Sequence, residues 1–394
     1  MTARESCPGI WGKLRRLCLN FILFLLSLFF ALILGETTLR LALNPGDFLA
    51  PTLVPDAILK YRIEPYSVGH DAWGFRNPEV PDSASIVIIG DSQSYGVNAP
   101  ASQSWPTQLG HFTGHSIYNL SLSGYGPVQY FYLLKEKASQ LRPAVVIIGF
   151  YLGNDLWDAY QMAHGYAHWR YLVKPEFGNA EILRAGPENE ALGNQAVLLG
   201  PLRVWMARHS VFYRLFSYTC AERLRNLQMK LLQSRTPEIT IMDDPAHHIH
   251  TGFTPGESLS VLDLQDSTVR EGLAISLDLL GRMNDFCAQQ RIAMVVVLIP
   301  TKESVYARYV EGNQALSHAG LMTEVIRAER DVNQKIKAFL AAHDIRCCDP
   351  LEALQQTAQL HIYPSNQEGH PTRMGYEVIA RTVADYLHEW RLIF

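Results

Sequence analysis

Runs of β-branched and aliphatic residues alternate along this chain with amphipathic stretches. Residues 86–89 and 144–148 are continuously apolar, and a third such run covers 294–299. Uninterrupted apolar runs of this length are typical of strands that are buried on both faces, as in parallel sheets. Apolar positions recur at helical spacing in 273–287 and again in 321–342. The alternation predicts an α/β fold built on a parallel sheet.

The predicted strands end in short polar or glycine-rich segments. Gly90-Asp91-Ser92 follows the first strand, Gly124 follows a short strand at 117–120, and Asn154 follows the strand at 144–148. Right-handed crossovers bring such strand ends to one edge of a parallel sheet, which is where ligands bind in α/β proteins. A serine that attacks an ester creates an oxyanion. The backbone N–H groups of Ser92 and Gly124 and the side-chain amide of Asn154 would supply three donors to it.

Each of these residues also has an ordinary structural interpretation. A serine after a strand often caps a helix, a glycine often makes a turn, and Asn-Asp often caps a loop. The segment is also not the nucleophile elbow of α/β-hydrolases, because Ser94 occupies the position where that motif requires glycine. The catalytic interpretation therefore depends on the three strand ends occurring together and on a base elsewhere in the chain.

A histidine near the end of the chain fits the role of that base. His370 is followed by Pro371, which favours the first turn of a helix, so the imidazole is expected at a rigid helix start. A histidine in this position suits a general base that activates Ser92. The alternative is a surface histidine beside a helix, one of fourteen in the chain.

The amino-terminal region is predicted to be a membrane anchor. Residues 17–34 are almost entirely apolar, and at 1.5 Å per residue they would span about 27 Å. Lys13, Arg15 and Arg16 precede this run and Glu36 follows it, so the positive-inside rule predicts a cytoplasmic amino terminus and an exported domain. The alternative is a cleaved signal peptide, for which residues 32–35 offer a poor cleavage site.

The alternation of strands and helices stops between 156 and 267. This stretch holds many aromatic residues, a predicted helical run over 202–234, and the sequence His247-His248-Ile249-His250. Three close histidines are sometimes metal ligands, but no carboxylate spacing completes a site here, so we predict an exposed loop and no metal site. The whole stretch is predicted to be an insertion at the sheet edge that acts as a lid or a substrate platform.

Composition excludes several other functions. The chain has 394 residues, a net charge of −4 and no long basic run in its body, which argues against nucleic acid as a partner. It lacks GxGxxG and GxxxxGK[ST] motifs, so no nucleotide cofactor is expected. Six cysteines are scattered without CxxC spacing and are interpreted as small buried residues, with one bridge through Cys220 or Cys287 as the alternative.

These observations predict the following division of the chain: a cytoplasmic tail at 1–16, a transmembrane anchor at 17–35, a stalk and leading edge at 36–80, the first half of the α/β domain at 81–155, the insertion at 156–267 and the second half of the domain at 268–394.

Four short sequence motifs of this chain together resemble those of the SGNH (GDSL-type) hydrolases, and in particular of their membrane-anchored bacterial envelope members. The matching segments are Gly90-Asp91-Ser92 with Gly96, the run 119–124 ending in Gly124, Gly153-Asn154-Asp155, and His370-Pro371-Thr372 with Gly375-Tyr376. They occur in the family's order and cover 84–155 and 268–394. The resemblance implies a flavodoxin-like three-layer α/β/α fold. It also implies Ser92 as nucleophile, His370 as base, and Ser92, Gly124 and Asn154 as the oxyanion hole.

The third member of the triad departs from the family pattern. The family usually has aspartate three residues before the histidine, where this chain has Gln367. Glu368 resembles a variant of the motif with the acid two residues before the histidine, and Asp349 at another predicted strand end is the alternative. A main-chain carbonyl that orients His370 would also leave an active dyad.

The resemblance and the anchor together predict an ester hydrolase that acts on O-acylated glycans of the cell envelope or the extracellular space. Transfer of the acyl group to a sugar hydroxyl is the first alternative, and it would need an acyl donor supplied by a membrane-embedded partner. A non-catalytic polysaccharide-binding or scaffold subunit is the second alternative.

Overall fold

The computed structural model describes residues 10–177, 200–217, 219–220, 239–310, 313 and 316–393, with side chains from residue 13 onward. Its central sheet has five parallel strands in the order β4-β3-β5-β8-β9. Their bounds are β3 Ile86–Gly90, β4 Ile117–Asn119, β5 Val145–Tyr151, β8 Ala293–Ile299 and β9 Arg346–Cys348. In chain order these strands read 2-1-3-4-5, which is the flavodoxin-like order. The predicted fold class is confirmed.

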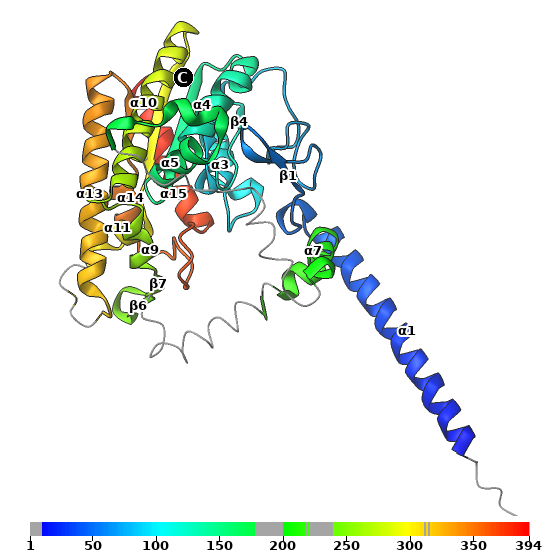
Figure 1. The fold of residues 1–394 in the computed structure, drawn as a ribbon. Helices are drawn as coiled ribbons and strands as arrows, with labels where there is room; N and C mark the ends of the chain where they lie inside the picture. The colour runs from blue at the N-terminus through cyan, green and yellow to red at the C-terminus, as the bar shows by residue number, and fades with distance from the viewer. Residues whose placement is uncertain are drawn as a thin grey trace, which may run out of the picture.

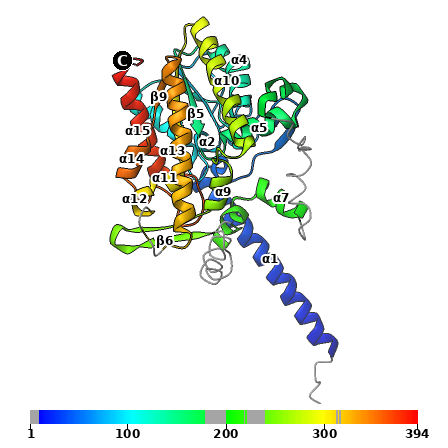
Figure 2. The same cartoon turned by 60° about the vertical axis from the view of Figure 1, so that its left-hand side comes forward.

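Helices cover both faces of this sheet, because side chains alternate along each buried strand. On β3, Val87 and Ile89 join one buried cluster, whereas Ile86 and Ile88 join the other. In Figure 2, α14 and α15 lie on one side of β5, and α4, α5 and α10 lie on the other. The helices of these two layers are α3 Trp105–Thr113, α4 Pro127–Glu136, α5 Asp155–Gly165, α10 Ser267–Gln289, α13 Ala319–Ala342, α14 Leu351–Gln356 and α15 Arg373–Glu389.

The first helix projects away from the domain (Figure 1). This helix, α1, covers Ile10–Ala42 and is therefore longer than the predicted anchor at 17–35. Its segment Lys13–Ala42 is long and apolar enough to cross a membrane, and none of the most apolar 18 residues within it is buried against the rest of the chain. By length and composition it fits either a membrane span or a signal sequence.

Between α1 and the sheet the chain forms a short antiparallel hairpin. Its strands are β1 Leu53–Asp56 and β2 Lys60–Ile63. The turn that follows is organised by the carboxylate of Asp71, which accepts hydrogen bonds from the backbone N–H groups of Trp73 and Phe75 and from the Tyr118 hydroxyl. The hairpin and turn thus pack against the edge of the sheet at β4.

The stretch between β5 and β8 lies in three different places. Helix α5 packs against α4 and α10, within the domain. Helix α7, Gly200–His209, lies beside the domain-proximal end of α1 (Figure 1). The hairpin of β6 Thr240–Asp244 and β7 Ile249–Phe253 leads into α9, Pro255–Ser260. Residues 178–199 and 221–238 lie outside the described part of the chain.

Two helical stretches are interrupted. Helix α4 ends at Glu136 and a 3₁₀ turn follows at Ala138–Leu141, because Lys137 leaves the helical region at φ −126°. The helical run expected over 202–234 is interrupted after α7. Ser210 breaks it, since its hydroxyl accepts a hydrogen bond from the N–H of Tyr213 and so caps a second helical stretch at 211–217. The rest of that run, 221–234, falls on residues that are not described.

The described cysteines are all free thiols: Cys18, Cys220, Cys287, Cys347 and Cys348. No bridge therefore joins Cys220 or Cys287 to another described cysteine. Cys287 and Cys348 are buried, and burial raises the pKa of the Cys287 thiol to about 12.

Candidate active site

Ser92 lies where β3 gives way to a short helix. This helix, α2, covers Ser92–Tyr95, and its cap is Asp91, whose carboxylate accepts a hydrogen bond from the N–H of Gln93 at 2.9 Å. The capping interpretation of Ser92 is therefore wrong, because Asp91 does the capping. The Ser92 hydroxyl donates to Asp91 Oδ2 at 3.2 Å. The backbone N–H and the hydroxyl of Ser92 therefore lie at the carboxyl end of β3.

The Asp91 carboxyl is fully buried beneath this serine. Burial raises the pKa of Asp91 to about 6, against the opposing effect of the hydrogen bond from Gln93. The sequence motif singled out Ser92 but gave Asp91 no role. The signal was present, because aspartate directly before a helix start is a strong N-cap.

The loop after β4 lies next to the Ser92 turn. The N–H of Leu122 donates to the carbonyl of Gly90 at 3.2 Å, which extends the pairing of β4 with β3 beyond the strand. Gly124 follows with φ +75°, and a Cβ at this position would lie 2.3 Å from the Tyr61 hydroxyl. That hydroxyl donates to the carbonyl of Ser123 at 2.5 Å. The left-handed φ and this close approach therefore favour glycine here.

Asn154 immediately precedes α5 on the other side of β3. Within the described chain its side chain makes no capping hydrogen bond, and its Oδ1 atom is buried without a partner. The neighbouring Asp155 fixes the turn, since its carboxylate accepts from the N–H of Tyr151 and from the Tyr130 hydroxyl. The turn is thus held by Asp155, and the Asn154 amide remains available to a ligand at the strand end.

His370 is paired with Glu368. A carboxylate oxygen of Glu368 accepts a hydrogen bond from His370 Nδ1 and, at 3.4 Å, from the His370 N–H. The hydrogen bond from His370 lowers the pKa of Glu368 below its usual range. With Nδ1 occupied as a donor, the neutral imidazole carries its lone pair on Nε2, which is the tautomer a general base requires.

Asp349, the alternative partner of His370, is occupied elsewhere. Its Oδ2 atom accepts from Lys337 Nζ at 2.5 Å and from Asn333 Nδ2 at 3.1 Å, and its Oδ1 atom accepts from the N–H of Leu351. These contacts close the turn between β9 and α14. The structure brings Glu368, rather than Asp349, to the imidazole.

Two contacts tie the His370 loop to the Ser92 turn. Gln93 Nε2, one residue after Ser92, donates to the carbonyl of Gly369 at 3.4 Å. The buried Tyr376 hydroxyl on α15 donates to the carbonyl of Val97 at 2.8 Å. These contacts join residues that are more than 270 positions apart, and they hold the serine turn and the histidine loop in one assembly.

A buried lysine binds the main chain of the loop that precedes His370. Lys302 Nζ donates to the main-chain carbonyls of Asn366 at 2.7 Å, Glu368 at 3.2 Å and Pro364 at 3.3 Å. Burial lowers the pKa of Lys302 to about 7, opposed by the carboxylates of Glu303 and Glu368. The sequence motifs assigned no role to Lys302, which follows the predicted strand at 294–299. Its place at the same sheet edge as Ser92 was the signal that could have found it.

A polar cleft of about 360 Å³ opens beside the Glu368–His370 pair. One wall is made by Gly153, Glu368 and Gly369. The facing wall comes from β7 and α9, which belong to the predicted insertion at 156–267, called the middle segment below. Glu257 and Ser258 line that second wall, and the Ser258 hydroxyl donates to the buried carboxylate of Glu303 at 2.8 Å. Glu368 lines this cleft together with hydroxyl and carboxylate groups, whereas Ser92 and His370 are not among the residues that line it.

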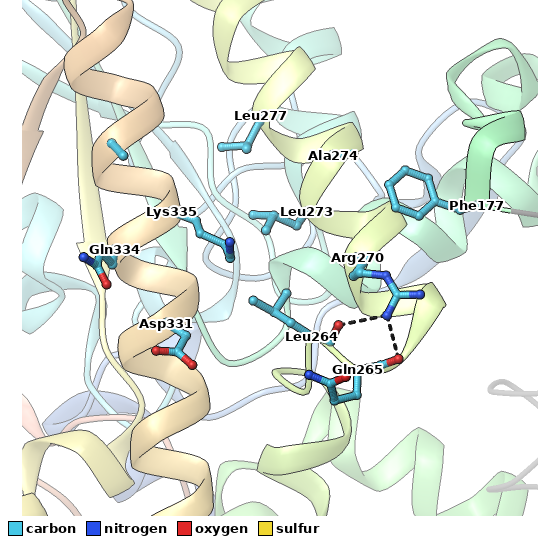
Figure 3. A pocket seen from close by; sticks show the side chains of 11 residues that line it. Phe177, Leu264, Gln265, Arg270, Leu273, Ala274, Leu277, Asp331, Gln334 and Lys335 are labelled. Atoms are coloured by element: carbon cyan, nitrogen blue, oxygen red, sulfur yellow. Dashed lines mark hydrogen bonds between the residues drawn. The ribbon is translucent and has the colours of Figure 1, made fainter.

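A larger hollow of about 730 Å³ lies between α10 and α13, away from the strand ends (Figure 3). Leu264, Leu273 and Leu277 line it, and the Arg270 guanidinium beside them is bonded to the carbonyls of Leu264 and Gln265. None of the candidate catalytic residues contributes to it. Its volume alone therefore does not make it the reaction site.

The three clustered histidines lie on the β6–β7 hairpin. His247 pairs with Asp244 at 2.7 Å, and His250 pairs with Asp243 at 3.4 Å. Both imidazoles are exposed, and within the described chain no group of three potential metal-binding side chains comes together.

No protein-family model matches this chain. No curated protein sequence matches it significantly either.

Several solved structures resemble the fold at low identity. One is a member of the lipolytic G-D-S-L protein family from Veillonella parvula, with 12% identity, 77% of this chain and 97% of that chain covered, and a TM-score of 0.35. A catalytic mutant of an acetylxylan esterase from Geobacillus stearothermophilus has 11% identity, coverage of 79% and 95%, and a TM-score of 0.37. A phospholipase A1 from Streptomyces albidoflavus has 11% identity, coverage of 77% and 98%, and a TM-score of 0.38. The Veillonella parvula protein is described as a member of the family that the sequence motifs resemble. Because all three TM-scores are below 0.5, the proposed activity rests on the site geometry above and not on these similarities.

Proposed function

We propose that this protein is a serine ester hydrolase in which Ser92 is the nucleophile, His370 the general base and Glu368 the residue that orients the base. The observation that carries this proposal is the hydrogen bond between Glu368 and His370 Nδ1, on a loop tied through Gln93 to the Ser92 turn. A carboxylate that fixes the tautomer of a histidine beside a strand-end serine has the geometry of a hydrolytic triad.

In the proposed acylation step, His370 Nε2 takes the proton of Ser92 Oγ as that oxygen attacks the ester carbonyl. For this the hydroxyl must turn from Asp91 toward the imidazole, which is a rotation about one side-chain bond. The N–H groups of Ser92 and Gly124 and the amide of Asn154 would donate to the oxyanion. Collapse of the intermediate breaks the ester C–O bond, and the alcohol leaves with the proton that His370 holds.

Deacylation repeats this sequence with water. His370 removes a proton from a water molecule as it attacks the acyl-Ser92 carbonyl, and returns that proton to Ser92 Oγ when the acid leaves. The imidazolium formed in each half is stabilised by the Glu368 carboxylate, whose lowered pKa keeps it ionised at neutral pH. No metal or cofactor takes part in these steps.

We propose O-acylated glycans of the cell envelope as the substrate class. The hydroxyl- and carboxylate-lined cleft next to His370 supports a polar, hydroxyl-rich ligand, because such groups exchange hydrogen bonds with sugar hydroxyls. The cationic residues before the apolar part of α1 support an orientation in which the domain faces the periplasm or the exterior. On this proposal the protein is a single-pass membrane protein anchored by α1.

The polar cleft also supports acyl transfer as a second candidate activity. A sugar hydroxyl held there would take the place of water in deacylation, and a membrane-embedded partner would then supply the acyl donor. The two activities differ in product, because hydrolysis releases a free acid and transfer yields a new ester. Analysis of both products from one acetylated glycan substrate separates them.

The test is labelling of the detergent-solubilised full chain by a fluorophosphonate, which phosphonylates an activated serine. We expect labelling of the wild-type chain, loss in Ser92→Ala and His370→Ala, and no change in His388→Ala, which removes an exposed histidine of α15. A folded wild-type chain that is not labelled would overturn the proposal in favour of a polysaccharide-binding or scaffold subunit.

A further inference from the structure

The middle segment of the chain has a part that lies far from the sheet edge, against the end of the apolar helix. Helix α7 and residues 210–217, together called the collar below, contact the last turns of α1 and the residues that follow it. The collar reaches α1 at the point where the apolar run 17–34 ends.

Glu36, two residues beyond that run, fastens the collar to α1. Its carboxylate accepts hydrogen bonds from the Ser210 hydroxyl at 2.9 Å and from the backbone N–H groups of Val211 and Phe212, both at 3.0 Å. The N–H groups are the unpaired donors at the start of the helical stretch 211–217, so a carboxylate is a suitable partner for them. One acidic side chain therefore joins two segments that are 174 to 176 positions apart in the sequence.

Three further hydrogen bonds hold the collar in the same place. Arg40 donates to the carbonyl of His209 at 2.7 Å. Arg214 donates to the carbonyl of Phe48 at 2.8 Å, and the N–H of Ala50 donates to the carbonyl of Ala207 at 3.0 Å. The collar is thus bonded at both of its helical stretches, and its position relative to α1 is fixed.

The collar is unusually rich in exposed large apolar side chains. Trp205 is 58% exposed and Phe216 is 61% exposed, with Leu202 and Phe212 also exposed. The ring of Phe212 lies beside the end of the apolar run, since a Cβ added to Gly35 would lie 3.7 Å from it. Large exposed aromatic residues in this number are costly in water, whereas tryptophan and other aromatics are favoured at a membrane–water interface.

The charge of the collar matches the same environment. Residues 200–217 contain three arginines, Arg203, Arg208 and Arg214, and no aspartate or glutamate. Arginine next to exposed aromatic residues on a short helix is typical of segments that lie in the headgroup region, where anionic lipids attract the cation. The whole chain has a net charge of −4, so the collar is more positive than the chain as a whole.

We propose that the collar is a membrane-interface surface whose exposed aromatic side chains enter the headgroup region of the bilayer that α1 spans. The occupant of this surface is lipid, because the collar is continuous with the predicted span and is bonded to it through Glu36. The consequence is a domain held at a fixed height and tilt above the bilayer by two attachments, the span and the collar. This inference rests on α1 being a membrane span, but it does not depend on the reaction at Ser92.

The experiment is photolabelling of the full chain in vesicles of phosphatidylcholine containing a minority of phosphatidylglycerol. The probe is a phosphatidylcholine with a diazirine near the carboxyl end of one acyl chain, and labelled peptides are identified by mass spectrometry. We expect label in α1 and in residues 200–217, and none above background in the hairpin of β6 and β7. The combined variant Trp205→Ala, Phe212→Ala and Phe216→Ala is expected to lose the label in 200–217, and Leu360→Ala, an exposed leucine near α14, is expected to retain it.

Label in α1 with none in 200–217 overturns the proposal, and it would mean that a protein partner or a second copy covers the collar. Absence of label from α1 overturns the span and the collar together. Fluorophosphonate labelling of Ser92 in the same vesicles is read separately, so an inactive chain with a labelled collar leaves this inference standing and removes only the proposed activity. If the triple variant fails to fold, as judged by loss of the wild-type thermal unfolding transition, the single variant Trp205→Ala replaces it with an expected decrease of label in 200–217.

Discussion

The sheet edge around His370 and the collar around Glu36 use the same device for different purposes. In both, one carboxylate accepts several hydrogen bonds and fixes a distant segment: Glu368 holds an imidazole, and Glu36 holds a helix start. The surfaces around them are opposite in character, since the cleft beside Glu368 is polar and concave, whereas the collar is aromatic and exposed. Parts of one middle segment contribute to both places.

The middle segment is therefore not a single lid. Its β7–α9 part lines the cleft near the histidine, and its α7 part is attached to the apolar helix. Changes at the first place are expected to alter chemistry and leave attachment unaffected, and changes at the second are expected to do the reverse. The following substitutions test this separation.

The largest effect is expected from Glu368→Gln. Loss of the carboxylate leaves the tautomer of His370 unfixed and the imidazolium unstabilised, so the rate of fluorophosphonate labelling should fall by about 10² to 10⁴. The matched control is Asp349→Asn, whose carboxylate is bound to Lys337 and not to the imidazole. If Asp349→Asn falls as far as Glu368→Gln, the assignment of Glu368 is wrong.

A smaller effect on the same reaction is expected from Lys302→Met. Three main-chain carbonyls of the histidine loop lose their shared donor, and we expect the labelling rate to fall about 10- to 100-fold, as for removal of residues that orient a reactive group. Lys302→Arg keeps a cationic donor and should recover part of the rate. Equal loss in both variants, together with a native melting temperature, would contradict a positioning role.

Lys302 also predicts a pH dependence of stability. The pKa of Lys302 is about 7 in the folded chain, whereas that of an unperturbed lysine, as in the unfolded chain, is 10.5. Between pH 7 and pH 10.5 the unfolded chain therefore binds one more proton than the folded chain. The free energy of unfolding should therefore rise with pH above 7, by at most about 2.7 kcal/mol at pH 9. The measurement is denaturant unfolding of wild type and Lys302→Met at pH 7 and pH 9. A wild-type rise no larger than that of the variant would show that the buried lysine stays protonated.

At the other region, Glu36→Gln should weaken the collar and leave the chemistry intact. An amide accepts the N–H groups of Val211 and Phe212 less strongly than a carboxylate, at a cost of about 1 to 2 kcal/mol in local stability. Limited proteolysis in detergent should then cut residues 200–217 faster. The labelling rate of Ser92 is expected to stay within about twofold of wild type, because distant sites act independently. A large fall in that rate would show that the two regions are coupled.

The smallest effect is expected from Glu257→Gln in the cleft. Glu257 lines the cleft from α9 and is not one of the proposed catalytic residues, so its loss should raise KM for an acetylated glycan a few-fold with little change in kcat, as for removal of one uniform binding contact. Labelling by a small fluorophosphonate should not change, because that probe does not reach across the cleft. A fall in kcat would instead assign Glu257 to the reaction.

The sequence alone determined the sheet and the approximate site. Uninterrupted apolar runs fixed which segments are buried strands, and the residues directly after them had to meet at one edge, which brings Ser92 and Gly124 to adjacent loops. The apolar run at 17–34 likewise determined that α1 is long enough to span a bilayer. The buried strands, the residues at their ends and the apolar helix each depend on residues that are close together in the chain. A single sequence is therefore enough to predict them.

Three features could be seen only in the folded chain. Glu368, and not Asp349, contacts His370; Lys302 binds the histidine loop; and Glu36 binds the collar. Each of these depends on two or more segments far apart in the chain, and a side chain's partner there is chosen by packing among several chemically suitable groups. Two carboxylates in loops near the same sheet cannot be told apart by sequence alone. They differ only because Lys337 reaches one of them and His370 the other.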